Sequence, residues 1–251
     1  MRHFETFSYR DASYRISPAD NTSLYKEITS RITEIRIELE AYIKRQPEFL
    51  TSLTPVNLLP KAPEPAVLMA EAAELTGTGP MAAVAGTTAS LAALRAAETL
   101  TTPRREIIIE NGGDIFILPG ADPEPVTAGI FSGIDSSFSN LALKVPPGAR
   151  GTALCSSSSR MGHSLSLGDC DLCTVVSGNA SLADAAATQG CNMVKAEADL
   201  GPAAEKISAI KGVTGVLIIK NKQLAIAGKM PEIVRHSDSE GLNKITGTFF
   251  L

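Results

Sequence analysis

The clearest periodic pattern in the chain lies at residues 23–45, where apolar side chains recur every three or four positions. This spacing places them on one face of an α-helix. They are Leu24, Ile28, Ile32, Ile35, Leu39 and Ile43. We expect the helix to end before Pro47, because a proline disfavours the α conformation of the preceding residue. Residues 1–20 predict an N-terminal pair of strands.

Prolines and glycines divide the next part of the chain. Four prolines at residues 53–65 predict an irregular spacer. A short helix is expected at residues 66–75 and a longer one at 81–100, separated by a glycine-rich break. The first half of the longer helix consists of small residues that include Gly86, so another backbone or a ligand can approach it closely.

Short apolar runs in the remaining chain predict strands. They cover residues 106–110, 115–118, 126–130, 141–145, 152–155, 172–177, 216–220 and 224–227. Further helices are expected at residues 181–189 and 202–210. Strict βαβ alternation is missing, which favours an α+β fold with mixed, mostly antiparallel sheets packed against helices. We expect one domain over residues 1–251 and leave open its division into two subdomains.

Composition narrows the classes of function. With 251 residues, of which 44% are hydrophobic and 20% charged, the chain can fold around its own core. A net charge of -4 argues against nucleic acid as a partner. The polar N-terminus and the lack of a long apolar stretch predict a cytoplasmic protein without a membrane span. Homo-oligomerisation stays open.

The four cysteines, Cys155, Cys170, Cys173 and Cys191, are expected to be unbridged thiols. Cys170 and Cys173 have the spacing of a zinc or redox motif, and the other two could complete four sulfur ligands. A cysteine-ligated metal or redox protein is therefore one alternative function. We favour buried thiols.

Asn111, Gly112, Gly113 and Asp114 connect two apolar strands. One glycine is enough for a tight hairpin, and a second could leave backbone N–H groups uncovered for a phosphate or a flat ring. Asp114 could then hold a ribose hydroxyl or a metal ion. A plain turn is the alternative.

Serines and a histidine follow the strand at residues 152–155. Ser156, Ser157 and Arg160 belong to a segment whose hydroxyls and guanidinium could bind a pyrophosphate. His163 lies between glycines and is a candidate general base. The alternatives are a solvated loop and a structural histidine.

Asp184 has two interpretations. Ser181 and Asp184 fit a capping box at the start of a helix, which would explain the aspartate fully. Thr188 follows four residues later and so shares a helical face with Asp184. A carboxylate and a hydroxyl on one face are hard oxygen ligands suited to Mg²⁺.

These motifs, in this order, resemble those of the ApbE family of flavin-binding proteins. Residues 111–115 (NGGDI) are similar to its N-x-GGD-I element, residues 155–158 (CSSS) to its A-T-S-G strand end, and residues 174–176 (TVV) to its V-T-V strand. His163 falls at the histidine of the family's H-I-x-D-P-x-T-G segment. Residues 183–188 (ADAAAT) match A-D-A-x-x-T, the most specific of these elements. Residues 79–86 (GPMAAVAG) look closest to an uncharacterised ApbE-related branch, sometimes labelled with thiamine biosynthesis.

The resemblance implies an ApbE-like fold that binds FAD or FMN with Mg²⁺ and transfers FMN from FAD to a hydroxyl of a protein acceptor. It implies that Asp184 and Thr188 bind Mg²⁺ with a backbone carbonyl, for which Ala85 is our candidate. It implies flavin contacts from Asn111 through Asp114, Ser156, Ser157 and Gly86, with His163 as the catalytic base.

The chain departs from the family at two places. The family helix A-K-G-Y-A-V-D is VAGTTAS at residues 84–90, without the lysine or the aspartate. The D-P-x-T-G after the histidine is replaced by SLSLG at residues 164–168. A binding module without catalytic activity is therefore the second alternative function.

Overall fold

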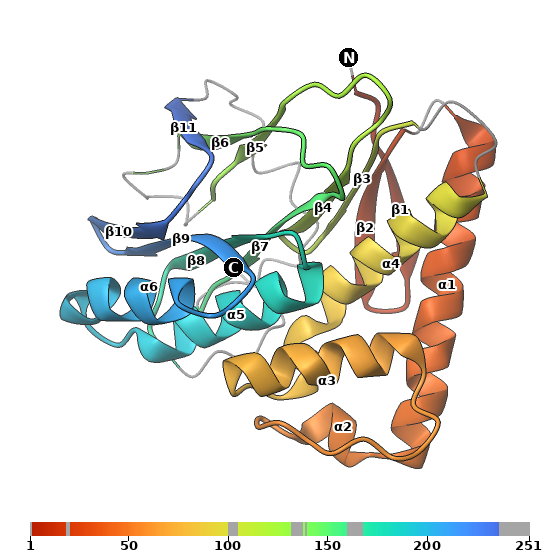
Figure 1. Ribbon diagram of the computed structural model, residues 1–251, viewed down its shortest axis with the longest axis horizontal. Helices are drawn as coiled ribbons and strands as arrows, with labels where there is room; N and C mark the ends of the chain where they lie inside the picture. Colours follow the sequence, from red (N-terminus) through yellow and green to blue (C-terminus); the bar gives the residue numbers. More distant parts are fainter. Residues whose placement is uncertain are drawn as a thin grey trace.

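The computed structural model describes residues 2–18, 21–99, 105–131, 138, 140–159 and 168–235. These residues form three layers, in which helices cover one face of an eight-stranded sheet and a three-stranded sheet covers the other (Figure 1). Every pair of neighbouring strands is antiparallel. The α+β class with antiparallel sheets is therefore confirmed.

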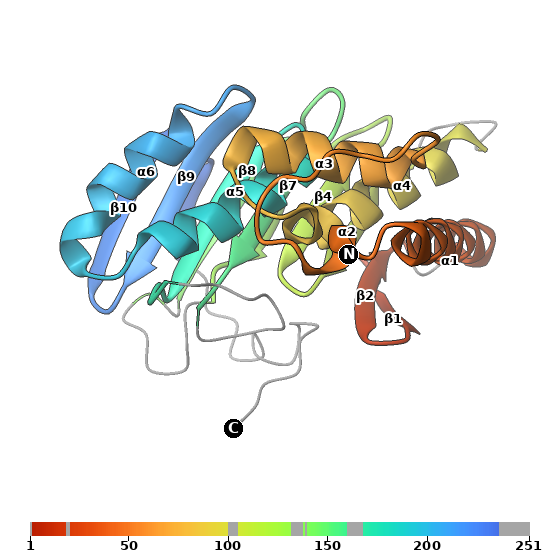
Figure 2. The ribbon, with the colours of Figure 1, turned by 90° about the horizontal axis from the view of Figure 1, so that it is seen from below.

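The helices lie against successive parts of the large sheet. They are α1 (Thr22–Arg45), α2 (Glu48–Thr51), α3 (Glu64–Thr76), α4 (Val84–Glu98), α5 (Ala180–Met193) and α6 (Leu200–Ser208), with 3₁₀ turns at Pro80–Ala83 and Glu197–Asp199. Figure 2 shows α6 over β9 and β10, α5 over β7 and β8, and α4 over the middle of the sheet. Within the described part of the chain, no helix is long and apolar enough to cross a bilayer.

Both sheets are built largely from hairpins. The large sheet has the order β1 (Glu5–Tyr9), β2 (Ala12–Ser17), β3 (Ile107–Asn111), β4 (Asp114–Leu118), β7 (Thr152–Ser157), β8 (Leu172–Ser177), β9 (Val213–Lys220) and β10 (Gln223–Gly228). The small sheet has the order β11 (Glu232–Arg235), β6 (Leu141–Val145) and β5 (Val126–Gly129).

Most predicted elements are present with shifted ends. Helix α1 buries the predicted face except Ile43, whose place toward the core is taken by Tyr42. Helix α3 begins at Glu64, so Pro65 lies in its first turn, where a missing N–H costs little, and the spacer is shorter than expected. Strand β7 continues through Ser157, so the first two serines belong to the strand. Helix α2 and strand β11 were not predicted.

Side chains of the large sheet alternate between two cores. Ile109 and Phe116 face the helices, whereas Ile108 and Ile117 face the small sheet. Asp114 precedes Phe116 by two residues and therefore belongs to the row that faces the helices. The same alternation places Cys155 and Ser157 of β7 on that face.

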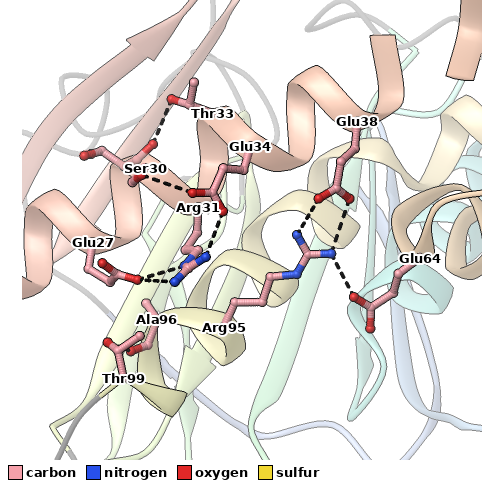
Figure 3. A network of polar contacts seen from close by, with 11 residues as sticks. Glu27, Ser30, Arg31, Thr33, Glu34, Glu38, Glu64, Arg95, Ala96 and Thr99 are labelled. Atoms are coloured by element: carbon pink, nitrogen blue, oxygen red, sulfur yellow. Dashed lines mark hydrogen bonds and ion pairs between the residues drawn. The ribbon is translucent and has the colours of Figure 1, made fainter. Parts of the chain in front are cut away.

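Ion pairs tie the helices together at the end of α4 (Figure 3). Arg95 of α4 contacts Glu38 of α1 at 3.1 Å and Glu64 of α3 at 2.8 Å. Arg31 of α1 pairs within its own helix, with Glu27 and Glu34. Helix α4 is thus attached to two other helices through its last turns.

Candidate functional site

The turn between β3 and β4 needs both of its glycines. Gly112 and Gly113 have φ values of 64° and 101°, the left-handed region that a two-residue hairpin turn requires. The N–H of Gly113 donates to Oε1 of Glu110 at 2.9 Å. This amide is therefore not uncovered, contrary to the expectation, and the conformation alone explains the second glycine. Flavin contacts from Asn111, Gly112 and Gly113 stay a prediction.

Asp114 is buried under the helices at the start of β4. Its Oδ1 accepts a hydrogen bond from the backbone N–H of Ser156 at 3.0 Å. The thiol of Cys155 also lies within hydrogen-bond reach of the Asp114 carboxylate. The same sulfur is 3.7 Å from the carbonyl oxygen of Ala180, the first residue of α5. Cys155 thus connects the Asp114 side chain to the start of α5.

Asp184 does not cap its own helix. Asn179 caps α5, because its side chain accepts a hydrogen bond from the N–H of Leu182 at 3.1 Å. Ser181, the expected cap, instead accepts a hydrogen bond from the Thr87 hydroxyl at 2.7 Å. The capping-box interpretation of Ser181 and Asp184 is wrong because α5 begins one residue before Ser181.

The Asp184 carboxylate binds the first turn of another helix, α4. Its Oδ2 accepts a hydrogen bond from the N–H of Gly86 at 2.9 Å, and the N–H of Ala85 also donates to it. The N-cap residue of α4, Ala83, has no side-chain acceptor for these groups. Asp184 therefore supplies the acceptor from a distant part of the sequence.

Gly86 permits this close approach of α4 and α5. A Cβ atom at this position would lie 2.4 Å from the carbonyl oxygen of Ala180 and 3.0 Å from Cβ of Asp184. The expectation that small residues of this helix allow another backbone to approach is confirmed.

The two aspartates oppose each other's ionisation. Burial raises the pKa of Asp184 to about 7, although the N–H groups of Gly86 and Ala85 favour the charged form. Burial, followed by the nearby Asp184 carboxylate, raises the pKa of Asp114 well above its usual range. Like charges held together in an apolar setting favour protonation or a bound cation.

The other predicted site residues in this region, Thr188, Ser156 and Ser157, lie at different positions relative to Asp114 and Asp184. Thr188 is buried one helical turn after Asp184 on α5. The Ser156 hydroxyl shares a hydrogen bond with Thr174 at 2.9 Å on the opposite face of the sheet, so only its N–H reaches Asp114. The Ser157 hydroxyl lies buried on the helix face beside the Cys191 thiol and makes no hydrogen bond of normal geometry with the described residues.

Arg160 and His163 fall in residues 160–167, outside the described residues. The assignment of His163 as the catalytic base therefore stays a prediction. The same holds for a role of Arg160 at a pyrophosphate.

The cysteines are all buried and unbridged, as expected. Burial raises the pKa of Cys155 and of Cys173, whereas a reactive thiolate requires a lowered pKa. Within the described part of the chain, no three or more His, Cys, Asp or Glu side chains are arranged to hold a metal ion. The described cysteines thus give no support to the metal or redox alternative.

Sequence reasoning missed two residues that contact this site. Cys155 was treated only as a thiol, yet it lies between Asp114 and Ala180. Glu110, which binds the turn through Gly113, was counted as part of a strand. A charged residue inside an otherwise apolar strand was the available signal for Glu110.

The sequence is similar to a known protein family and to several of its members. A family model described as "AbpE bacteria" matches residues 14–218. A UPF0280 protein from Methanocella arvoryzae is 38% identical over 252 residues, covering 97% of this chain and 99% of the relative. A UPF0280 protein from Archaeoglobus fulgidus is 36% identical over 249 residues, covering 96% and 98%.

Two solved structures share the fold. The ApbE protein from Thermotoga maritima has a TM-score of 0.54 at 15% identity and covers 94% of this chain and 97% of its own. A mutant of the flavin transferase ApbE from Vibrio cholerae has a TM-score of 0.55 at 12% identity, covering 98% and 99%. At these identities the likeness concerns the fold alone.

Proposed function

The chain belongs to the AbpE bacterial family of ApbE-like proteins, and on this premise we propose that it binds a flavin nucleotide, FAD or FMN, together with Mg²⁺. We further propose that it transfers FMN from FAD to a hydroxyl group, with a protein as the acceptor. A solved structure with the same fold is named a flavin transferase, which supports this reaction class.

The arrangement around Asp184 is the observation that carries the proposal. The most specific of the sequence elements, residues 183–188, lies buried in α5 against the first turn of α4. Asp114, from the second element, is close enough for its pKa to be raised by Asp184. Two elements about 70 residues apart in sequence therefore meet in one place, as a functional site requires.

The residues at this place fit Mg²⁺. This cation binds hard oxygen atoms and commonly uses one or two protein carboxylates, completing its shell with waters and substrate phosphates. Asp184 supplies a carboxylate, and Thr188 supplies a hydroxyl on the same helix. The N–H of Ala85 donates to Asp184, and its carbonyl as a third ligand stays a proposal. Bound Mg²⁺ would neutralise the charge of the FAD pyrophosphate.

The proposed reaction replaces a phosphoanhydride bond of FAD by a phosphate ester bond. The acceptor hydroxyl oxygen forms a bond to the FMN phosphorus, the bond from that phosphorus to the AMP phosphate oxygen breaks, and AMP leaves with the electron pair. We assign His163 to accept the hydroxyl proton. The turn at Asn111 through Asp114 and the Ser157 hydroxyl would bind and orient the nucleotide.

A binding module without turnover is the second candidate. It is favoured by the first turns of α4, which lack the lysine and the aspartate of the family helix. In such a module Asp184 would still hold the start of α4, and FAD would be retained without cleavage.

One set of measurements tests both candidates. The purified full chain is titrated with FAD with and without Mg²⁺, and binding is followed by calorimetry and by the flavin absorption. The mixture is then supplied with an acceptor peptide that carries a hydroxyl side chain and is analysed by chromatography for FMN-modified acceptor and AMP. Mg²⁺-dependent binding with AMP release supports the transferase, and binding without AMP release supports the module. No FAD binding under either condition would overturn the proposed function.

A further inference from the structure

We propose that Asp114 is a second carboxylate ligand of the divalent cation, so that the ion is held between β4 and α5. The inference rests on the proposed function in placing that cation at Asp184. It adds a ligand that the A-D-A-x-x-T element does not contain.

A chain of short contacts joins the two carboxylates. Asp114 is within hydrogen-bond reach of Cys155, whose sulfur is 3.7 Å from the carbonyl oxygen of Ala180. That carbonyl packs against Gly86, whose N–H is 2.9 Å from Oδ2 of Asp184. Both carboxylates therefore enter the same space between the sheet and the two helices.

Among the described residues, neither carboxylate has a cationic partner. Asp114 and Asp184 form no ion pair with a lysine or arginine in the described residues. Their exposed fractions are only 6% and 8%, so water screens them weakly. Two buried like charges need a counter-charge or a proton, and a divalent cation balances both at once.

Ser157 provides an independent observation. Only 5% of the Ser157 surface is exposed, and its hydroxyl, which lies beside the Cys191 thiol, makes no hydrogen bond of normal geometry with the described residues. It follows Cys155 by two positions on β7 and shares its face. A buried hydroxyl without a partner costs free energy unless a ligand satisfies it. A cation or one of its waters would do so.

Each of the two carboxylates accepts a backbone hydrogen bond with one of its oxygen atoms. One oxygen of Asp184 is committed to the N–H of Gly86, and Oδ1 of Asp114 is committed to the N–H of Ser156. The N–H of Ala85 and the thiol of Cys155 also donate to these two carboxylates, and each carboxylate still has lone-pair positions for the ion. A site with one oxygen from each of two aspartates, completed by water or phosphate, suits a small hard cation.

The test uses the full chain and Mn²⁺ alone as the probe, with free Mn²⁺ measured by electron paramagnetic resonance. We expect Asp114→Asn and Asp184→Asn each to weaken Mn²⁺ binding by about tenfold or more. Asp171→Asn is the matched control, because Asp171 is also buried at a strand end but accepts a hydrogen bond from the N–H of Asn221. Its Mn²⁺ affinity should equal that of the wild type.

The outcomes separate this inference from the proposed function. Wild-type affinity in Asp114→Asn together with loss of binding in Asp184→Asn would overturn the role of Asp114 and leave the site at Asp184 intact. Absence of Mn²⁺ binding in the wild type, with or without FAD, would overturn both.

A second measurement on the wild type does not depend on the folding of a variant. Mg²⁺ is titrated into ¹⁵N-labelled protein and the backbone amide signals are followed. The signals of Gly86 and Ser156, whose N–H groups donate to Asp184 and Asp114, should both move. Movement of the Gly86 signal without movement of the Ser156 signal would count against Asp114 as a ligand. The amide of Asn221, which donates to the control residue Asp171, serves as the reference that should not move.

Discussion

Asp184 on α5 accepts a hydrogen bond from the backbone N–H of Gly86 on α4, with 2.9 Å between Oδ2 and the nitrogen. One side chain therefore closes the start of a helix that lies about 100 residues earlier in the sequence. Capping and cation binding make different demands on this residue, and substitutions can separate them.

Asp184→Asn should separate the two roles. At about pH 4, where the Asp184 carboxyl of the folded protein is still protonated, an asparagine oxygen can accept the Gly86 N–H in its place, so the free energy of unfolding of the metal-free protein should change by about 1 kcal/mol or less. The stabilisation by FAD with Mg²⁺ should disappear, because the charge is gone. Thermal unfolding with and without both ligands measures this. Asp184→Ala, which has no acceptor, should be less stable than Asp184→Asn by about 1 kcal/mol.

The stability of the metal-free protein should fall as pH rises toward and through 7. An unfolded aspartate titrates near pH 3.9, whereas burial raises the pKa of folded Asp184 to about 7. Between these values the folded state binds more protons than the unfolded state, so the free energy of unfolding decreases with pH. Melting temperatures measured from about pH 5 to about pH 8 test this, at about 2–4 °C per kcal/mol. The slope should be shallower in Asp184→Asn, and an unchanged slope would assign the effect to other groups.

Gly86→Ala should destabilise the protein. The added methyl group would meet the Ala180 carbonyl oxygen at 2.4 Å, so α4 and α5 must separate, at a cost of about 1–3 kcal/mol. Gly201→Ala is the matched control, because it also lies in a helix and has no atom within 4 Å of the new Cβ. Chemical denaturation should show a loss for Gly86→Ala and a neutral or small stabilising effect for Gly201→Ala. Equal stability of both variants would contradict the close packing at Gly86.

The cysteines should be unreactive in the folded protein. All four are buried, and those in β7 and β8, Cys155 and Cys173, have raised pKa values. A thiol reagent should therefore modify none of them under native conditions and all four in denaturant. Rapid modification of one cysteine in the native protein would show that its segment opens or that its thiol is activated.

Local patterns predicted much of the fold but not its three-dimensional contacts. Helix α1 follows from its apolar spacing, and the β3–β4 hairpin follows from Asn111 through Asp114. Helix α2 has only four residues, too few for a periodic signal. Strand β11 pairs with β6, nearly a hundred residues earlier, so its strand character depends on that distant pairing.

In the candidate site, too, local patterns located individual residues but not the contacts between them. The motif order located Asp114 and Asp184, but nothing local indicates that Asp184 binds α4 instead of its own helix. Ser156 and Ser157 are adjacent and chemically identical, yet strand alternation turns their hydroxyls to opposite faces. That difference became visible only when β7 was seen to include both residues.

Arg95 fixes the orientation of α4, and this orientation affects how the opposite end of the helix would interact with an anion. The aligned peptide dipoles of a helix leave partial positive charge at its first turn. In α4 this end faces Asp184, while Arg95 joins the last turns to Glu38 and Glu64. The electric field of the α4 dipole therefore has a fixed direction once the helices are packed. A nucleotide phosphate arriving near Asp184 would meet a field already oriented, without reorganisation of the protein around it.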